Sequence, residues 1–406
     1  MADEMKRLLL ASFCSETGEW MLQIALPVLV FQATGSVAST AVMMIVGLLP
    51  MVLLSPLTGF VADRVHRPRL LLVVCLGQAV VAAPLLADDA MCWVVMALQT
   101  SLAAFFEPAR NALVADLVPV ERRTAANGLL AASANIARLV GAWLGGMLLA
   151  AGGIPLVYAV YAGILVVGAV AMCGPFPVTR PAKAVKLPPL RVDRSLLPIG
   201  IALTLMCVAQ GIFLVRFVPF VLETLGAGAG GVGLLRGVQA IGGLAAGFAV
   251  ATVARKVAPT GLFAWGAVAF GLVSACIWHG PALTTAIGVY VGMFIAVGAP
   301  GVIANSGLAA VLQSAVPAAM TGRLLAAAFA LMTLGTTAGM LVAGAVASPL
   351  LLDAQAFLHV AAGVLLLAHQ HRHRVRDARR ARFAGGEAPQ LQTGEQRDDR
   401  AGDPVR

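Results

Sequence analysis

The chain has 406 residues, of which 60% are hydrophobic and 12% are charged. Soluble domains average roughly 45–50% apolar and about 25% charged residues, so the composition excludes an ordinary soluble protein. In a soluble chain the net charge of +9 would suggest a nucleic-acid partner. In a membrane protein the same excess is typical of cytoplasmic loops.

Apolar stretches of about 20 residues recur along the chain, and each is long enough to cross a hydrocarbon core of roughly 30 Å as a helix. We therefore predict an all-α integral membrane protein with twelve transmembrane helices. The spans are drawn at residues 8–31, 39–60, 70–87, 90–115, 124–151, 154–175, 196–222, 230–253, 261–279, 281–305, 324–347 and 350–369. The segment 176–195 is rich in proline and cations, and we interpret it as a cytoplasmic linker between two six-helix bundles, residues 1–175 and 196–370.

The lysines and arginines predict the orientation of these spans. With the N-terminus in the cytoplasm, 24 of the 28 cations fall on the cytoplasmic side, as the positive-inside rule requires. We expect a multi-pass protein of the cell membrane with both termini in the cytoplasm and no nucleic-acid partner. The other four cations lie inside spans, and they are Arg110, Arg138, Arg216 and Arg236.

The segment 371–406 is basic, and His369, His371 and His373 alternate with arginines at its start. We predict a largely disordered cytoplasmic tail that binds anionic lipid rather than a metal. The motifs GxxxxGK[ST] and HExxH are absent. We therefore expect neither a cofactor nor enzymatic activity, and the sequence disfavours a nucleotide-driven pump.

The loop between the second and third spans reads Gly59-Phe-Val-Ala-Asp63-Arg64-Val-His66-Arg67-Pro-Arg69. It resembles the signature loop of the major facilitator superfamily. The resemblance implies two six-helix bundles that work by alternating access, with Gly59, Asp63, Arg64 and Arg67 as conformational switch residues. The alternative is that these are ordinary cations of a cytoplasmic loop.

Small residues in the fifth span, among them Gly128, Gly141, Gly145 and Gly146, resemble the antiporter motif of the drug-exporting branch. Generic close packing of helices is the alternative. The run from Phe106 to Arg110 is similar to the 12-span drug-efflux and siderophore-exporter type. The resemblance implies a monomeric secondary transporter that exports small amphipathic molecules, and a proton-coupled importer or a non-transporting scaffold or receptor remains open.

Charges inside spans cost about 2.5–3.5 kcal/mol each at a span centre and usually face a cavity or a partner. In the first span Ser12, Glu16, Glu19 and Gln23 follow helical spacing and form one stripe. Two carboxylates one turn apart repel each other, which favours uptake of a proton. We predict that Glu16 and Glu19 couple transport to protons, together with Glu107.

The resemblance implies a central cavity lined mainly by spans 1, 4, 7 and 10. The candidates for substrate binding are Gln23, Arg110, Asn111, Asn135, Arg138, Gln210, Arg216, Phe217, Arg236 and Gln239. Structural alternatives stay open: Glu107 and Arg110 could form an ion pair that only fixes packing, Arg216 and Arg236 could reach the membrane surface, and Phe217 could be simple core.

Overall fold

The computed structural model describes residues 2–176, 196–253, 257–316, 318–346 and 348–384, and every structural statement concerns these residues. Their contacts define one compact unit that ends at Leu367 and a second that begins at Ala368. The described residues form helices and turns, without a strand. The predicted all-α class is confirmed.

The α-helices are α1 (Ala2–Thr34), α2 (Val37–Leu53), α3 (Ser55–Arg64), α4 (Arg67–Val81), α5 (Cys92–Leu117), α6 (Arg123–Ala171), α7 (Leu197–Pro219), α8 (Gly228–Val253), α9 (Pro259–His279), α10 (Ile287–Ser314), α11 (Ala318–Ala345) and α12 (Leu350–Ala384). Short 3₁₀ turns flank several of them, and a π-helical turn, η5 (Phe220–Thr224), continues α7.

Within the described residues, nine helices are long and apolar enough to cross a membrane, and α2 is a shorter apolar helix. α6 extends over 49 residues and contains two of the predicted spans. Gly153 divides it, with φ 65° and ψ −163°, a backbone conformation essentially restricted to glycine. The number of twelve spans stays a prediction.

Several boundaries differ from those predicted. The span predicted at 39–60 is two helices, α2 and α3, because Pro56 has no N–H with which to continue the backbone hydrogen bonds across Leu54. α10 begins at Ile287 rather than near residue 281, after a 3₁₀ turn ending at Ala282. α12 continues to Ala384, so the first part of the predicted tail is helical.

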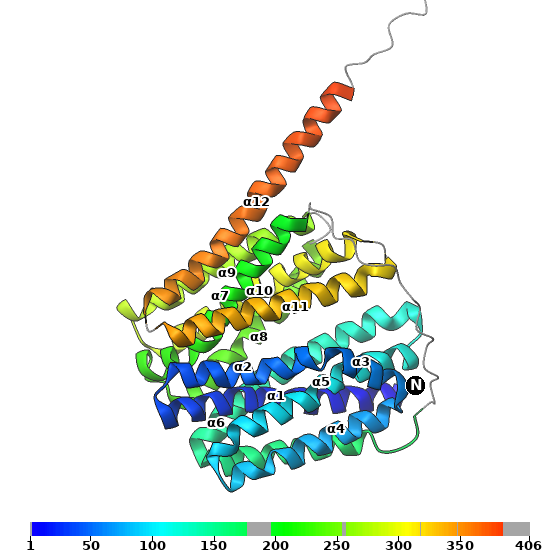
Figure 1. Cartoon of the computed structure of the whole chain (residues 1–406), viewed down its shortest axis with the longest axis vertical. Coiled ribbons are helices and arrows are strands. Elements are labelled where there is room, and N and C mark those ends of the chain that lie inside the picture. The colour runs from blue at the N-terminus through cyan, green and yellow to red at the C-terminus, as the bar shows by residue number, and fades with distance from the viewer. Residues whose placement is uncertain (1, 177–195, 254–256, 317, 347, 385–406) are drawn as a thin grey trace, which may run out of the picture. The chain divides into compact units, whose positions relative to one another are not determined.

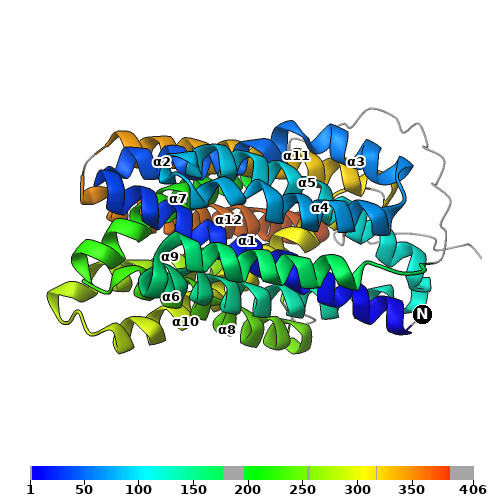
Figure 2. The ribbon, with the colours of Figure 1, turned by 90° about the horizontal axis from the view of Figure 1, so that it is seen from below.

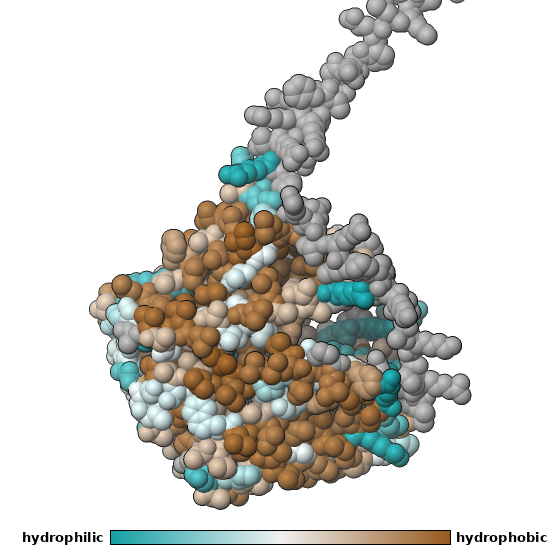
Figure 3. Space-filling model, viewed as in Figure 1, coloured by the Kyte–Doolittle hydropathy of each residue, from teal (hydrophilic) through white to brown (hydrophobic). Residues whose placement is uncertain are grey.

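Up to Leu367, the helices from the two parts of the sequence gather in two groups (Figure 1), with α1–α6 in blue to teal and α7–α11 in green to orange. Seen from below, the long helices lie roughly alongside one another (Figure 2). α6 packs against α1 and α8, and α11 packs against α7 and α2, so most contacts between the groups run through α6–α8 and α2–α11, with smaller contributions from α2–α7, α1–α8 and α1–α7. The visible face is mostly hydrophobic (Figure 3), as contact with lipid requires.

Candidate functional site

Three neighbouring cavities among these helices contain most of the predicted site residues. The first, here called the acidic cavity, has a volume of about 270 Å³ and is lined by Ser15, Glu16, Glu19, Trp20, Met51, Ala103, Phe106, Glu107, Arg110 and Ala134. It brings together all three carboxylates predicted for proton coupling, although Glu107 comes from α5 and the other two from α1. The helical stripe on α1 therefore faces a cavity.

Arg110 organises the acidic cavity. It forms an ion pair with Glu16, and the two side chains are only 13% and 17% exposed. Its other terminal nitrogen lies 3.7 Å from Glu107, which is 62% exposed. Oε2 of Glu16 is buried without a hydrogen-bond partner among the described residues. One arginine thus serves two carboxylates and leaves a buried carboxylate oxygen unsatisfied.

Glu19 has a different partner, because Nε2 of Gln23 donates to Oε1 of Glu19 at 2.9 Å. The charged groups whose fields reach Glu19 are Glu16, Glu107 and Arg110. If all three carboxylates were ionised, this region would carry a net charge of −2 among closely packed helices. Like charges so near one another repel, so the arrangement favours at least one bound proton.

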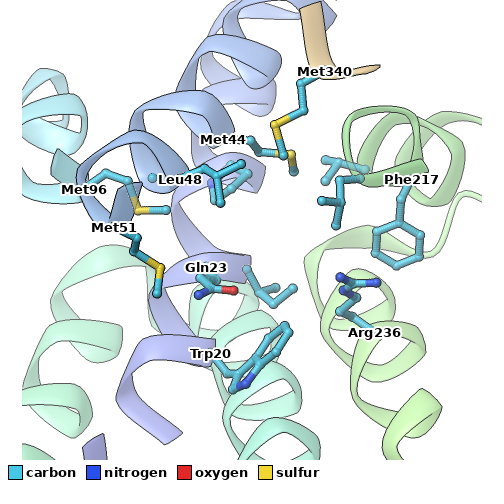
Figure 4. A pocket seen from close by; sticks show the side chains of 14 residues that line it. Trp20, Gln23, Met44, Leu48, Met51, Met96, Phe217, Arg236 and Met340 are labelled. Carbon is cyan, nitrogen blue, oxygen red and sulfur yellow. The ribbon is translucent and has the colours of Figure 1, made fainter. Parts of the chain in front are cut away.

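The second cavity, here called the methionine cavity, has a volume of about 150 Å³. Figure 4 shows its labelled side chains pointing into one space, with methionines on one side and Phe217 and Arg236 on the other. Its lining is Trp20, Gln23, Ile24, Pro27, Met44, Gly47, Leu48, Met51, Met96, Leu214, Phe217, Val218, Arg236 and Met340. Methionine side chains are flexible and polarizable, and they suit surfaces that accept ligands of varied shape.

The third cavity, here called the arginine cavity, has a volume of about 200 Å³. Its lining is Asn135, Arg138, Gln210, Phe213, Arg236, Gln239, Gly243, Phe270, Val297, Gly298, Gly301, Val302 and Asn305. Oε1 of Gln239 accepts hydrogen bonds from Arg138 on α6, at 2.6 Å, and from Arg236 on α8, at 3.1 Å. The two predicted binding arginines therefore meet at one amide oxygen.

The three cavities share residues. Trp20 and Met51 line both the acidic and the methionine cavity, and Arg236 lines both the methionine and the arginine cavity. Gln23 also links the methionine cavity to the acidic cavity. It lines the methionine cavity, and its amide donates a hydrogen bond to Glu19 in the acidic cavity. A ligand in the methionine cavity would therefore contact side chains of both neighbouring sites.

Two other predicted residues lie elsewhere. Asn111 lines a separate cavity together with Arg110, Arg123 and Asn127. Arg216 lines none of the three named cavities, and its guanidinium donates to the backbone oxygen of Val346, just after α11. Sequence reasoning did not identify Trp20, the methionines or Asn305 as lining residues.

In the predicted switch loop, Arg67 is 9% exposed and forms an ion pair with Asp116 near the end of α5. Nε of Arg67 also donates to the backbone oxygen of Ala62 at 3.4 Å. Arg64 lies over the ring of Phe60, 3.4 Å from its centroid, and Gly59 has open space around it. The side chain of Asp63 lies outside the described part of the chain.

The predicted glycines differ in their contacts. A Cβ at Gly141 or Gly145 would collide with the backbone of α1, at Thr17 and Met21 respectively. A Cβ at Gly146 would lie 2.9 Å from Cα of Gly233 on α8, whereas Gly128 has nothing within 4 Å. Three of the four glycines therefore let α6 approach its neighbours closely.

Comparison with known proteins places the chain in a family. The sequence profile of the Major Facilitator Superfamily matches residues 8–340. The chain is 28% identical over 166 residues to "Uncharacterized MFS-type transporter YfiS" of Bacillus subtilis (strain 168), which is 40% of each protein. It is 29% identical over 155 residues to "Multidrug efflux pump Tap" of Mycolicibacterium fortuitum, which is 35% of this chain and 38% of Tap. The matches span about two fifths of these relatives.

Solved structures of similar fold cover nearly the whole chain. A bacterial homologue of the iron transporter ferroportin, in an inward-facing state, has a TM-score of 0.73 at 14% identity, over 91% of this chain and 99% of that one. The POT family transporter PepTSo has a TM-score of 0.74 at 11% identity, over 92% and 98%. At such identities the likeness establishes the fold alone.

Proposed function

The chain belongs to the Major Facilitator Superfamily of membrane transporters, and from this premise we propose that it exports small amphipathic molecules in exchange for protons. The observation that carries the proposal is the acidic cavity: three carboxylates and one arginine of α1 and α5 line it, directly beside an apolar cavity. The name of one relative, a multidrug efflux pump, supports export.

Proton binding belongs to Glu16 and Glu19 in this proposal. Both lie on one face of α1 and line the acidic cavity, and Glu16 has a buried oxygen without a donor. A proton on this oxygen would remove a charge that is costly in the membrane. It would also weaken the attraction that holds Arg110 in place.

Arg110 supplies the link between protonation and conformation. Because Glu107 lies 3.7 Å from the same guanidinium, protonation of Glu16 would favour a shift of Arg110 towards Glu107. The pair Glu16–Arg110 joins α1 to α5, so the exchange changes a contact between helices. A proton can bias a conformational equilibrium only through such a difference between states.

The substrate would occupy the methionine cavity. Apolar side chains cover most of its wall, while Gln23 and Arg236 provide polar contacts (Figure 4). This combination suits an amphipathic compound. Gln210, Asn135 and Gln239 would extend the site into the arginine cavity.

Alternating access would reuse the contacts described above. Arg67 and Asp116, together with Arg64, would form the switch at one end of the helices, and the glycines of α6 would form the surface that moves against α1 and α8. We propose that the chain works as a monomer, with both termini in the cytoplasm and its basic tail at anionic lipid.

One inward proton at 100 mV releases about 2.3 kcal/mol through the electrical term, enough for roughly fifty-fold accumulation. The test uses proteoliposomes with an imposed proton gradient and a panel of amphipathic dyes. We expect Glu16→Gln and Glu19→Gln to abolish gradient-driven transport. Glu223→Gln, at an exposed carboxylate, is the matched control and should transport normally.

The direction of dye movement against the gradient separates an exporter from an importer. Dye movement that depends on the gradient in wild type and persists in the double variant Glu16→Gln/Glu19→Gln would refute the assignment of the proton site. A scaffold or receptor would show no substrate-dependent proton movement at all, and this result would refute the transport proposal itself.

A further inference from the structure

The arginine cavity holds two cations without a carboxylate. None of the ion pairs found among the described residues involves Arg138 or Arg236. Arg236 is only 9% exposed. The carboxylates of the acidic cavity do not pair with it, because they are grouped around Arg110. Buried charges in proteins are normally paired, so these two guanidiniums lack the partner that burial requires.

Hydrogen-bond donors in the same place also lack acceptors. Both arginines share the single oxygen Oε1 of Gln239. Nε of Arg138 and Nε2 of Gln239 are buried and have no acceptor among the described residues. Gln239 as a whole is only 6% exposed. An unsatisfied buried donor costs free energy. A ligand with several acceptor oxygens would satisfy all of these groups at once.

Trp20 holds the two cations in position. The guanidinium carbons of Arg138 and Arg236 lie 4.9 and 5.8 Å from its ring centroid, and Arg236 also lies 5.5 Å from the ring of Phe213. Aromatic faces stabilise cations without neutralising them. The rings therefore orient the guanidiniums and leave their charge available to an anion.

The shape of the space around Arg236 sets a second requirement. Arg236 lies on the boundary between the arginine cavity and the methionine cavity, and in Figure 4 its head group points into the space shared with Phe217 and the methionines. A molecule with an anionic head at the two arginines would place its apolar body against these side chains.

We propose that the site binds amphipathic anions, with a carboxylate, sulfonate or phosphate head held by Arg138, Arg236 and the free amide nitrogen of Gln239, and an apolar body in the methionine cavity. This assignment rests on the proposed function, because it names the substrate class of the proposed transporter. Arginine is well suited to such heads, since its planar fork donates two parallel hydrogen bonds to oxyanions.

The test measures equilibrium binding to the full chain in lipid nanodiscs, with no proton gradient. The probes are anilinonaphthalene sulfonate and its uncharged parent phenylnaphthylamine, which share an aromatic body and differ by the sulfonate. Empty nanodiscs supply the lipid background. The variants are Arg138→Gln, Arg236→Gln and the pair together, and Arg122→Gln, an exposed arginine, is the control for a general loss of positive charge.

Wild type should bind the sulfonate more tightly than the parent compound. Each cavity variant should weaken sulfonate binding by about ten- to a hundredfold and change binding of the uncharged probe less than about threefold, and the double variant should abolish the preference. Arg122→Gln should leave both affinities unchanged. Unchanged binding of the uncharged probe also shows that a variant is folded. If a glutamine variant does not fold, Arg236→Lys, which keeps the positive charge, replaces it.

Equal affinity for both probes in wild type, or equal weakening of both by the variants, would overturn the proposal. Competition by sodium sulfate distinguishes the source of the anion: if sulfate displaces the probe at the probe's own dissociation constant, the site serves a free inorganic anion and the amphipathic class is wrong. Because binding is measured without a gradient, proton-driven export of an uncharged dye can survive a negative result here. A positive result can likewise stand if proton coupling fails.

Discussion

Arg110 on α5 forms an ion pair with Glu16 on α1, and both side chains are largely buried. The pair joins two helices that are separated by 94 positions in the sequence at these residues. It also places the positive charge where a neighbouring carboxylate, Glu107, can compete for it. The stability of the protein should therefore depend on the two partners unequally.

Arg110→Gln is expected to be the more damaging change. It leaves Glu16 and Glu19 facing each other without a cation, and loss of one partner of a buried pair costs about 3 kcal/mol. At neutral pH the purified variant should have a lower midpoint of thermal unfolding than wild type. Acidification should raise the variant's midpoint part of the way back, because protons neutralise the carboxylates. The double variant Glu16→Gln/Arg110→Gln should be more stable than Arg110→Gln. A double variant no more stable than Arg110→Gln would contradict this account.

Asp116→Asn tests the contact between α4 and α5. The variant removes the ion pair that joins buried Arg67 on α4 to α5, so we expect slower transport and a lower unfolding midpoint. Exchange of the two residues, Arg67→Asp with Asp116→Arg, should restore part of both. Arg69→Gln is the comparison, because Arg69 is an exposed cation on α4 close to Arg67 in the sequence. If Arg69→Gln slowed transport as much as Asp116→Asn, the ion pair would not be the controlling contact.

Gly146→Ala tests the close approach of α6 and α8. The added methyl group would lie 2.9 Å from Cα of Gly233 and closer still to the backbone oxygen of Ala229. Backbone atoms cannot yield as a flexible side chain can, so we expect destabilisation of about 1–3 kcal/mol. Gly163→Ala is the matched control on the same helix, since a Cβ there meets nothing within 4 Å. Equal unfolding midpoints for the two variants would show that the helices separate easily.

The local features of the candidate site could be predicted from the sequence, because they follow from helical spacing. Glu16, Glu19 and Gln23 lie on one face of α1 and line two neighbouring cavities that share lining residues. Glu107 and Arg110 are one turn apart on α5 and within 3.7 Å. In each case the period of the helix alone brings the residues together.

The partners between helices could not be predicted. The meeting of Arg138 and Arg236 at Gln239 depends on how α6 and α8 are rotated about their axes, and hydropathy carries no information about that rotation. Asp116 was missed as the partner of Arg67 for the same reason. In the sequence, the sign of the break between α2 and α3 is Pro56 in an apolar stretch. A proline alone does not show whether a helix kinks or ends.

Met51 separates the acidic from the methionine cavity, because it lines both. Met51→Trp should fill space in the region where substrate and proton sites meet. We expect transport of bulky dyes to fall at least about tenfold, while smaller compounds of the same series lose less, because added side-chain volume excludes large ligands first. Initial rates in proteoliposomes across a size series measure this. Met91→Trp is the control, since Met91 is exposed in the turn before α5 and lines none of the three cavities. A uniform loss across the size series, with normal unfolding of Met51→Trp, would show that Met51 affects the transport cycle rather than the space available to substrate.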